Sequence, residues 1–144
     1  MVLINTLSLE QMLQRLKSNL KQIQKSWYIA FFQIPYLPEL IIKKFGDKIG
    51  IEKNKTPLLN QYRKAFQKIF FLSQSEKITA PMLILSSKND PYLLPPSHVE
   101  FEKHAAHFTI RVLEGGHWIQ KEKPEYVNQL IDQFLAQLSK GVIQ

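Results

Sequence analysis

Apolar residues along this chain follow two patterns, short continuous runs and longer stretches with helical spacing. The continuous runs have strand length and lie at Val2–Ile4, Met82–Leu85 and Phe108–Leu113. Apolar residues recur every three or four positions at residues 9–23, 59–70 and 127–138, which is typical of helices. Strands that alternate with helices in this order predict an α/β fold with a three-stranded parallel sheet.

Capping residues indicate where the helices begin. Ser8, followed three residues later by Gln11, has the form of a capping box, so a helix is expected from residue 9. Thr56-Pro57 and Pro124 each suit the first turn of a helix. Pro95-Pro96 predicts a further helix that extends to about residue 106.

The connection between the first two strands, about residues 6–80, is far longer than a single crossover helix requires. It therefore predicts an inserted helical subdomain. We expect residues 1–7 and 77–144 to form the core and residues 8–76 to form the insertion. Within the insertion, two prolines interrupt the aromatic-rich segment Ser26–Leu40 and predict short helices joined by a bend.

Composition narrows the class of protein. The 144 residues are enough for one hydrophobic core, and 44% are hydrophobic and 22% charged. The absence of cysteine excludes disulfides and thiolate chemistry and fits a reducing cytoplasm, which is the expected location. The longest apolar stretch, Trp27–Leu37, is far shorter than the roughly 20 residues that cross a bilayer, so no membrane partner is expected.

Positive charge is concentrated in residues 1–70, which carry 12 lysines and arginines against four acidic residues. The simplest interpretation is that these lysines form the solvated faces of amphipathic helices. A nucleic-acid surface is the alternative, but no helix-turn-helix, RNA-binding or zinc-finger spacing accompanies it, so no nucleic-acid partner is expected. His98, His104 and His107 do not share one helical face, and no metal site is expected.

Two residues suited to catalysis follow the second and third predicted strands. Asp90 comes shortly after Met82–Leu85, and His117 comes after Phe108–Leu113 and a Gly-Gly pair. Because the carboxyl ends of parallel strands meet at one edge of a sheet, both side chains are expected there. An acid followed by a histidine matches the last two members of a catalytic triad in the chain order nucleophile, acid, base.

The first member of such a triad is not found in this sequence. The nucleophile would stand in a Gly-x-nucleophile-x-Gly turn, whose backbone also supplies part of the oxyanion hole. The glycines occupy positions 46, 50, 115, 116 and 141, and they bracket no serine or aspartate in that way. No nucleophile is therefore assigned.

Four segments occur in an informative order: Ser26–Pro35, Asn60–Arg63, Pro81–Pro91 and Gly115–Asn128. Together they span most of residues 2–138, and they resemble the α/β-hydrolase family, within it the epoxide-hydrolase-like branch. The resemblance implies a partial α/β-hydrolase fold, namely the C-terminal half with a helical cap. Residues 2–5 would then be the strand that follows the nucleophile turn, and the nucleophile half would be absent.

The resemblance also implies roles for individual residues and no cofactor. Asp90 would orient and charge-stabilise the imidazole of His117, which would activate a water or a serine. Tyr62 stands at one of two tyrosine positions that polarise an epoxide oxygen, whereas Phe31 stands at the other. Esterase, lactonase and dehalogenase chemistry therefore stay open beside epoxide hydrolysis.

Trp27, Phe31 and Trp118 are expected to form the apolar wall of a substrate pocket, which implies a small apolar substrate. Two classes of function stay open. In the first, the chain is a hydrolase fragment that is inactive without a complementing N-terminal half. In the second, it is a non-catalytic remnant or a protein-interaction module. Because the strand at Val2–Ile4 would present a bare apolar edge, we expect the chain to bind such a half or to form a homodimer.

Overall fold

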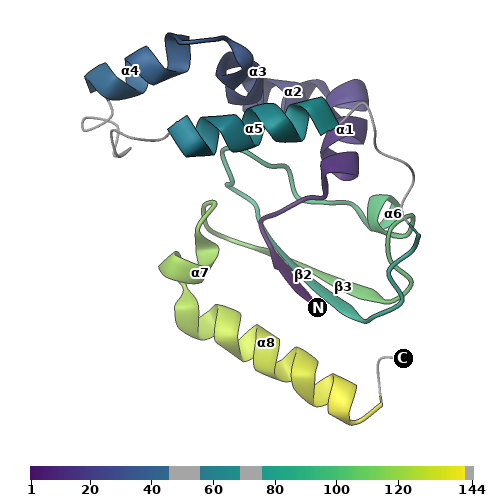
Figure 1. Ribbon diagram of the computed structural model, residues 1–144. Helices are drawn as coiled ribbons and strands as arrows, with labels where there is room; N and C mark the ends of the chain where they lie inside the picture. Colours follow the sequence, from purple (N-terminus) through teal and green to yellow (C-terminus); the bar gives the residue numbers. More distant parts are fainter. Residues whose placement is uncertain (46–55, 69–75, 142–144) are drawn as a thin grey trace. The chain divides into compact units, whose positions relative to one another are not determined.

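The computed structural model describes residues 1–45, 56–68 and 76–141 (Figure 1). In chain order, its elements are β1 (Val2–Ile4), α1 (Leu9–Ser18), α2 (Leu20–Lys25), α3 (Trp27–Gln33), α4 (Leu37–Phe45), α5 (Thr56–Lys68), β2 (Met82–Ser87), α6 (His98–Phe101), β3 (Phe108–Leu113), α7 (Ile119–Glu122) and α8 (Pro124–Ser139). Among the described residues, no helix is both long and apolar enough to span a membrane.

The chain divides into two compact units, Met1–Gln11 with Gln74–Gln144 and Met12–Ser73. The first, here called the sheet unit, holds the strands together with α6, α7 and α8. The second, here called the helical unit, holds α2 to α5 and most of α1. The sequence placed a cap at residues 8–76, and the role of the helical unit as a cap stays a prediction.

The sheet has three parallel strands in the order β1-β2-β3. Val2 lies opposite Leu83, and Met82 lies opposite Phe108. The predicted α/β fold is confirmed, and β1 and β3 have the limits that the apolar runs indicated. β2 extends beyond its apolar run to Ser87, since its two terminal serines still pair with the last residues of β3.

The core of the sheet unit lies on both faces of β2, which is buried along its whole length. On one face, helix α8 packs against the sheet (Figure 1), and the buried residues there are Leu83, Leu85, Leu113, Ile119, Val127 and Phe134. On the other face, the buried residues are Met82, Ile84, Phe101 and Ala105. Successive β2 side chains point to opposite faces, so a continuous apolar run supplies both clusters, as a parallel sheet covered on both sides requires.

Several predicted helix starts agree with the structure. The Ser8 hydroxyl accepts from the backbone N–H of Gln11 at 3.1 Å, and the Gln11 side-chain oxygen accepts from the backbone N–H of Ser8 at 3.0 Å. This is the reciprocal capping box that was expected. Helix α8 begins at Pro124, as predicted. Helix α5 begins at Thr56. The apolar pattern predicted over residues 59–70 continues to Ile69 and Phe70, which lie outside the described residues.

The continuous helix expected over residues 9–23 is wrong. The chain instead forms α1 and α2, separated at Asn19, whose side-chain oxygen accepts from the backbone N–H of Gln22 at 3.2 Å and caps α2. After this break, the apolar residues of α2 no longer continue the buried side of α1. Leu20 is 79% exposed, whereas Gln22 is fully buried. A side chain that bonds its own backbone competes with a continuous helix, which apolar spacing does not register.

The helix expected from Pro95-Pro96 to residue 106 is also wrong. Helix α6 covers only His98–Phe101, and the Ser97 hydroxyl caps it by accepting from the backbone N–H of Glu100. The following residues pair in parallel with Ile78 through a bridge to Ala105. The carbonyl of His104 and the N–H of Ala106 bond Ile78 in this bridge, so they are not available for the hydrogen bonds of a helix that continues to residue 106.

Candidate active site

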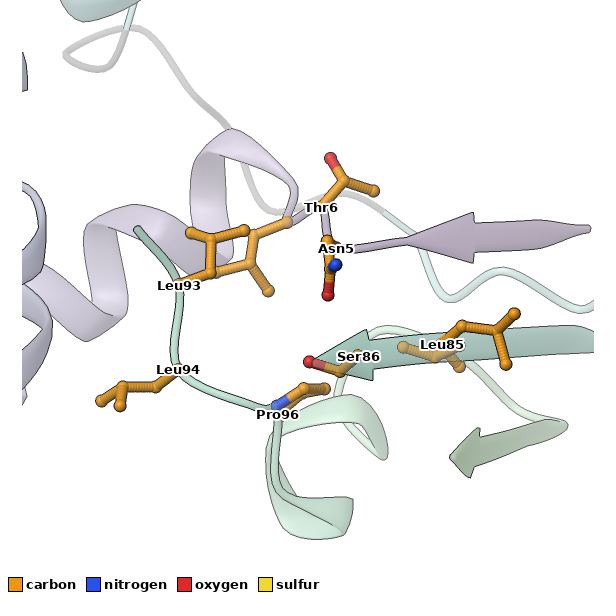
Figure 2. A pocket seen from close by; sticks show the side chains of 9 residues that line it. Asn5, Thr6, Leu85, Ser86, Leu93, Leu94 and Pro96 are labelled. Carbon is orange, nitrogen blue, oxygen red and sulfur yellow. The ribbon is translucent and has the colours of Figure 1, made fainter. Parts of the chain in front are cut away.

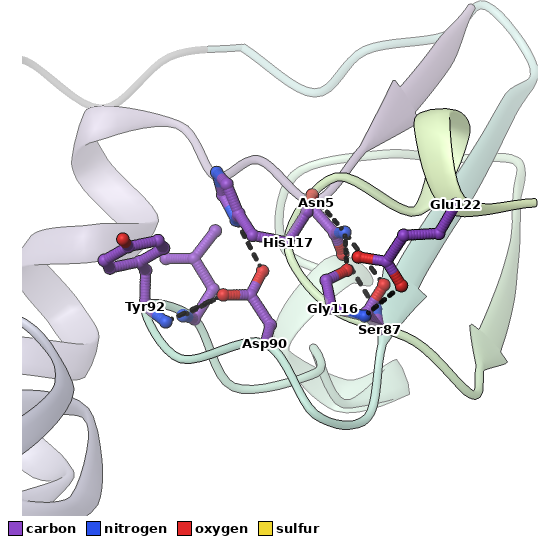
Figure 3. A network of polar contacts seen from close by, with 8 residues as sticks. Asn5, Ser87, Asp90, Tyr92, Gly116, His117 and Glu122 are labelled. Carbon is purple, nitrogen blue, oxygen red and sulfur yellow. Dashed lines mark hydrogen bonds and ion pairs between the residues drawn. The ribbon is translucent and has the colours of Figure 1, made fainter. Parts of the chain in front are cut away.

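The predicted acid and base lie at the carboxyl ends of neighbouring parallel strands (Figure 3). Asp90 follows β2, and His117 follows β3. The two side chains meet, with His117 Nδ1 at 2.7 Å from Asp90 Oδ2. Asp90 is fully buried, and the side chain of His117 is partly exposed. A pair 27 residues apart in sequence is therefore brought into direct hydrogen-bonding contact.

The second oxygen of Asp90 is held by its own loop. Asp90 Oδ1 accepts from the backbone N–H of Tyr92 at 2.7 Å and from that of Leu93 at 3.0 Å. Such hydrogen bonds offset the cost of burying a carboxylate. The position of the acid is thus set within residues 90–93, independently of the histidine.

The contacts of His117 assign its tautomer. An ionised carboxylate only accepts hydrogen bonds, so Nδ1 carries a hydrogen and donates a hydrogen bond to Asp90. In the neutral ring, Nε2 is then the nitrogen that can accept a proton. The imidazole also makes edge-to-face contacts with Tyr92 and Trp118, each with ring centroids 5.0 Å apart. These rings on two sides restrict its rotation. The arrangement suits a general base whose free nitrogen receives a proton.

The turn that carries the histidine is held through its carbonyl groups. The backbone N–H of Asn89 donates to the carbonyl of Gly115 at 3.2 Å. The side-chain nitrogen of Asn5 donates to the carbonyl of Gly116 at 3.2 Å and to that of His117 at 2.8 Å. Three successive carbonyls are therefore bonded to Asn5 and Asn89, which lie within two residues after the ends of β1 and β2.

The Gly-Gly pair is explained by close packing. A Cβ on Gly115 would overlap the side chain of Ile119, and one on Gly116 would lie 2.7 Å from Glu122 Oε1. The same Glu122 side chain accepts from the backbone N–H of Gly116 at 2.8 Å. Neither glycine has a positive φ. The turn needs glycine because α7 approaches it so closely.

Sequence reasoning missed three residues of this network, Asn5, Ser87 and Glu122. Asn5 and Ser87 meet each other across 82 residues, and Asn5 meets His117 across 112, whereas Glu122 bonds Gly116 only six residues away. One signal was present in the sequence for Asn5, since an asparagine directly after an apolar strand suits a left-handed backbone position. No comparable signal marks Ser87 or Glu122.

An exposed ion pair lies beside the site. Lys88 Nζ and Glu114 Oε1, which directly follow β2 and β3, are 2.8 Å apart. The hydrogen bond from Lys88 lowers the pKa of the Glu114 carboxyl, and the bond to Glu114 raises the pKa of Lys88. Exposed pairs of this kind contribute little to stability.

The predicted substrate contacts are divided between the two units. In the helical unit, Tyr62 makes edge-to-face contacts with Tyr28 and Phe32 at centroid distances of 6.1 Å and 5.1 Å. Trp27 is 66% exposed and lies 5.9 Å from Phe31, ring to ring. Their contact with a substrate stays a prediction.

Trp118, the fourth predicted contact, belongs to the sheet unit. It is 55% exposed and lies directly beside the His117 ring. The Lys121 ammonium lies 5.1 Å from the centre of the indole ring. Trp118 therefore stands next to the acid–base pair within the sheet unit.

A shallow pocket lies where β1 and β2 end (Figure 2). Its lining residues are Asn5, Thr6, Leu7, Ile84, Leu85, Ser86, Leu93, Leu94 and Pro96. Its cavity volume is about 10 Å³, roughly enough for a single water molecule, so this pocket by itself is not a substrate site. In the described part of the chain, no group of three His, Asp or Glu side chains is arranged to hold a metal ion.

The sequence is similar to several hydrolases of known name, although no protein-family model matches it. It is 30% identical over 138 residues to the AB hydrolase superfamily protein YfhM of Bacillus subtilis, covering 77% of this chain and 48% of that protein. It is 26% identical over 153 residues to epoxide hydrolase 3 of Xenopus tropicalis, covering 83% of this chain and 41% of that protein. Human epoxide hydrolase 4 is 26% identical over 149 residues, and the match covers 81% of this chain and 41% of that protein.

Solved structures show the same fold at lower identity. An epoxide hydrolase from Bacillus megaterium, crystallised with an inhibitor, has a TM-score of 0.62 at 20% identity, covering 88% of this chain and 56% of that one. A putative acyltransferase from Salmonella enterica has a TM-score of 0.75 at 18% identity, and the match covers 94% of this chain and 55% of that one. The chain spans about half the length of the relatives it matches. Within that span, the chain has the α/β-hydrolase fold and is epoxide-hydrolase-like in sequence.

Proposed function

We propose that this chain supplies the acid, the base and a helical cap of an α/β-hydrolase-type hydrolase. The supporting observation is the 2.7 Å hydrogen bond between Asp90 and His117 at the carboxyl ends of neighbouring parallel strands. In this proposal, His117 Nε2 takes a proton from a hydroxyl or a water as that oxygen attacks the substrate. The same proton then passes to the leaving oxygen, and Asp90 stabilises the charged imidazolium between the two steps.

The nucleophile and the oxyanion hole are proposed to come from polypeptide outside residues 1–144. This sequence contains no Gly-x-Ser-x-Gly or Gly-x-Asp-x-Gly turn. Within the described residues, β1 pairs with β2 alone, so its other edge is open to a further strand. A complementing N-terminal half fits there, with a second copy of this chain as the alternative occupant. Without such a partner, the chain is proposed to be inactive.

The substrate is proposed to be small and apolar, in contact with Tyr62, Trp27, Phe31 and Trp118. Epoxide hydrolysis is favoured by the names of the relatives. Phe31 has no hydroxyl to polarise an epoxide oxygen, so ester, lactone and haloalkane hydrolysis stay as alternatives. No cofactor, nucleic acid or membrane enters the proposal, and a cytoplasmic location stays a prediction.

A non-catalytic interaction module is the second candidate. The observation that favours it is the same open edge of β1, which would bind a strand whether or not chemistry follows. The two candidates differ in what His117 does. In the module, replacing His117 leaves every measurable property of the bound complex unchanged.

The decisive experiment begins with the DNA immediately upstream of the Met1 codon, read in all three frames. If it encodes a Gly-x-Ser-x-Gly or Gly-x-Asp-x-Gly turn, the two segments are produced together and assayed with styrene oxide and a p-nitrophenyl ester. We expect turnover that falls by roughly 10⁴-fold in Asp90→Asn and in His117→Ala. The control is Asn128→Ala, at an exposed position of α8. Turnover that survives His117→Ala contradicts the proposed role of the histidine. An upstream sequence without such a turn, or a complex without turnover, contradicts the proposal and favours the module.

A further inference from the structure

Asn5, directly after β1, uses its whole side chain in hydrogen bonds (Figure 3). Its Oδ1 accepts from the backbone N–H of Ser87 at 2.7 Å, and its Nδ2 donates to the Ser87 hydroxyl at 2.8 Å. The same Nδ2 donates to the carbonyls of His117 and Gly116 at 2.8 Å and 3.2 Å. Asn5 is 8% exposed. One amide therefore joins the ends of β1 and β2 to the turn that carries the histidine.

The backbone of Asn5 is in the left-handed region, with φ of +42°. Its N–H still donates to the carbonyl of Leu85 at 2.9 Å, which continues the pairing of β1 with β2. Asparagine visits this region more readily than most residues, because its short polar side chain bonds locally. The position thus requires both a tolerant backbone and a side chain with a donor and an acceptor.

The bonds of Asn5 matter for the acid–base pair because the two partners are held separately. Asp90 is held by the N–H groups of its own loop. The backbone of His117 is held from outside its loop, and Asn5 bonds the carbonyl of that residue itself. The His117 carbonyl is thus held by Asn5, which is not part of the loop that holds Asp90.

We propose that Asn5 is a positioning residue, whose amide group holds the His117 backbone so that the imidazole stays bonded to Asp90. This inference rests on the proposed function, which makes His117 the base. A misplacement of about 1 Å in a reacting group can cost on the order of 10²-fold in rate. In the reconstituted hydrolase, Asn5→Ala should therefore lower kcat by about 10²-fold, with little change in KM.

The structural test compares Asn5→Asp with Asn5→Ala in the full chain. Aspartate keeps the shape and the acceptor toward Ser87 but places a carboxylate oxygen against two carbonyl oxygens. The readout is the NMR signal of the Nδ1 proton that His117 shares with Asp90. If the amide acts as a donor, Asn5→Asp weakens this signal more than Asn5→Ala does. If Asn5 only fills space, the order is reversed, because alanine leaves the larger void. The reversed order overturns the proposal.

Two measurements keep this test decisive. Asn128→Asp makes the same chemical change at an exposed site on α8, and it should leave the His117 signal unchanged. If the Asn5 variants do not fold, the unsubstituted protein is examined instead. The side-chain amide protons of Asn5 should then exchange with water far more slowly than those of Asn128, and equal rates would overturn the proposal. Neither measurement requires turnover, so a failure of the proposed hydrolase function is seen separately, as an intact His117 signal without activity.

Discussion

The two faces of the sheet in one unit and the helices α1 and α2 in the other bury different kinds of residue. In the sheet unit, the buried clusters on the two faces of the sheet are entirely apolar. In the helical unit, α1, α2 and the residue after them bury Arg15, Gln22 and Ser26 while Leu20 is largely exposed; the buried apolar residues of its described part include Ile42 and Leu59. A parallel sheet offers two broad apolar surfaces, so an apolar stripe on a crossing helix finds a partner. The short helices α1 and α2 have no such sheet to pack on, and polar bonds determine which side of α2 faces inward.

Polar contacts of Arg63 connect three helices of the helical unit, in addition to the aromatic contacts of Tyr62. Arg63 of α5 donates to the carbonyls of Phe32 and Ile34 at 2.9 Å and 3.0 Å, where α3 ends. It also makes a two-pronged ion pair with Glu39 of α4, at 2.5 Å and 3.1 Å. The hydrogen bond from Arg63 lowers the pKa of the Glu39 carboxyl below its ordinary value of 4.5.

A polar contact inside the helical unit accounts for the buried side of α2. Gln22 Nε2 donates to the Ser26 hydroxyl at 2.8 Å, and that hydroxyl lies 3.8 Å from Met12 Sδ. A buried amide must be hydrogen-bonded to avoid a large desolvation cost, and this contact meets that need. Leu20 then lies on the opposite side of α2 and is left facing solvent.

The largest effect should appear when an apolar core residue of the sheet unit is shortened. Phe134→Ala removes a buried ring between α8 and the sheet, and it should lower the free energy of unfolding by about 3–5 kcal/mol. Urea unfolding followed by circular dichroism measures this. Leu135→Ala, at the neighbouring exposed position, is the control and should change it by less than about 0.5 kcal/mol. Equal effects would contradict the assignment of this face as the core.

Within the helical unit, two leucines provide a matched test of the finding that α2 exposes Leu20 and buries Gln22. Leu59 is 1% exposed on α5, whereas Leu20 is 79% exposed on α2. Leu59→Ala should lower the free energy of unfolding by about 2–5 kcal/mol. Leu20→Ala should change it by less than about 0.5 kcal/mol. Urea denaturation of both variants decides the matter, and a large loss in Leu20→Ala would show that α2 buries its apolar side in solution.

The close approach of α7 to the histidine turn predicts a smaller loss at the glycines. Gly115→Ala forces the buried Ile119 side chain to move, and we expect a loss of about 1–3 kcal/mol in the free energy of unfolding. Gly116→Ala should cost less, because the Glu122 carboxylate it meets is at the end of a flexible side chain. Thermal unfolding of both variants measures the order, and a larger loss at Gly116 would contradict it.

The smallest expected effect is a dependence of stability on pH in the helical unit. The pKa of Glu39 is lowered by folding, so its contribution is present above about pH 4.5 and is lost as the pH falls through the lower, folded value. The pair is partly exposed, which limits this contribution to below about 1 kcal/mol. Unfolding midpoints at pH 6 and pH 3 should differ less in Glu39→Gln than in the unsubstituted protein. An identical difference in the two proteins would contradict this role.

Much of the site was predictable because it follows from strand order. Asp90 and His117 each come within five residues after an apolar run, and parallel strands bring their carboxyl ends together. The Ser8–Gln11 capping box and the start of α8 at Pro124 were likewise visible, since both depend on residues within a few positions of each other. The break at Asn19 and the short α6 were not, because each depends on a hydrogen bond that competes with the helix.

The sequence alone therefore determined the α/β class, the three parallel strands and the two residues at the edge of the sheet. These features depend on local periodicity and on one rule of chain direction. Only the tertiary structure decided which residues hold the histidine and which side of each helix is buried. Asn5 meets His117 across 112 residues, and Arg63 meets its partners across 24 to 31. Hydrogen bonds between such distant groups depend on folded geometry, and no spacing along the chain encodes them.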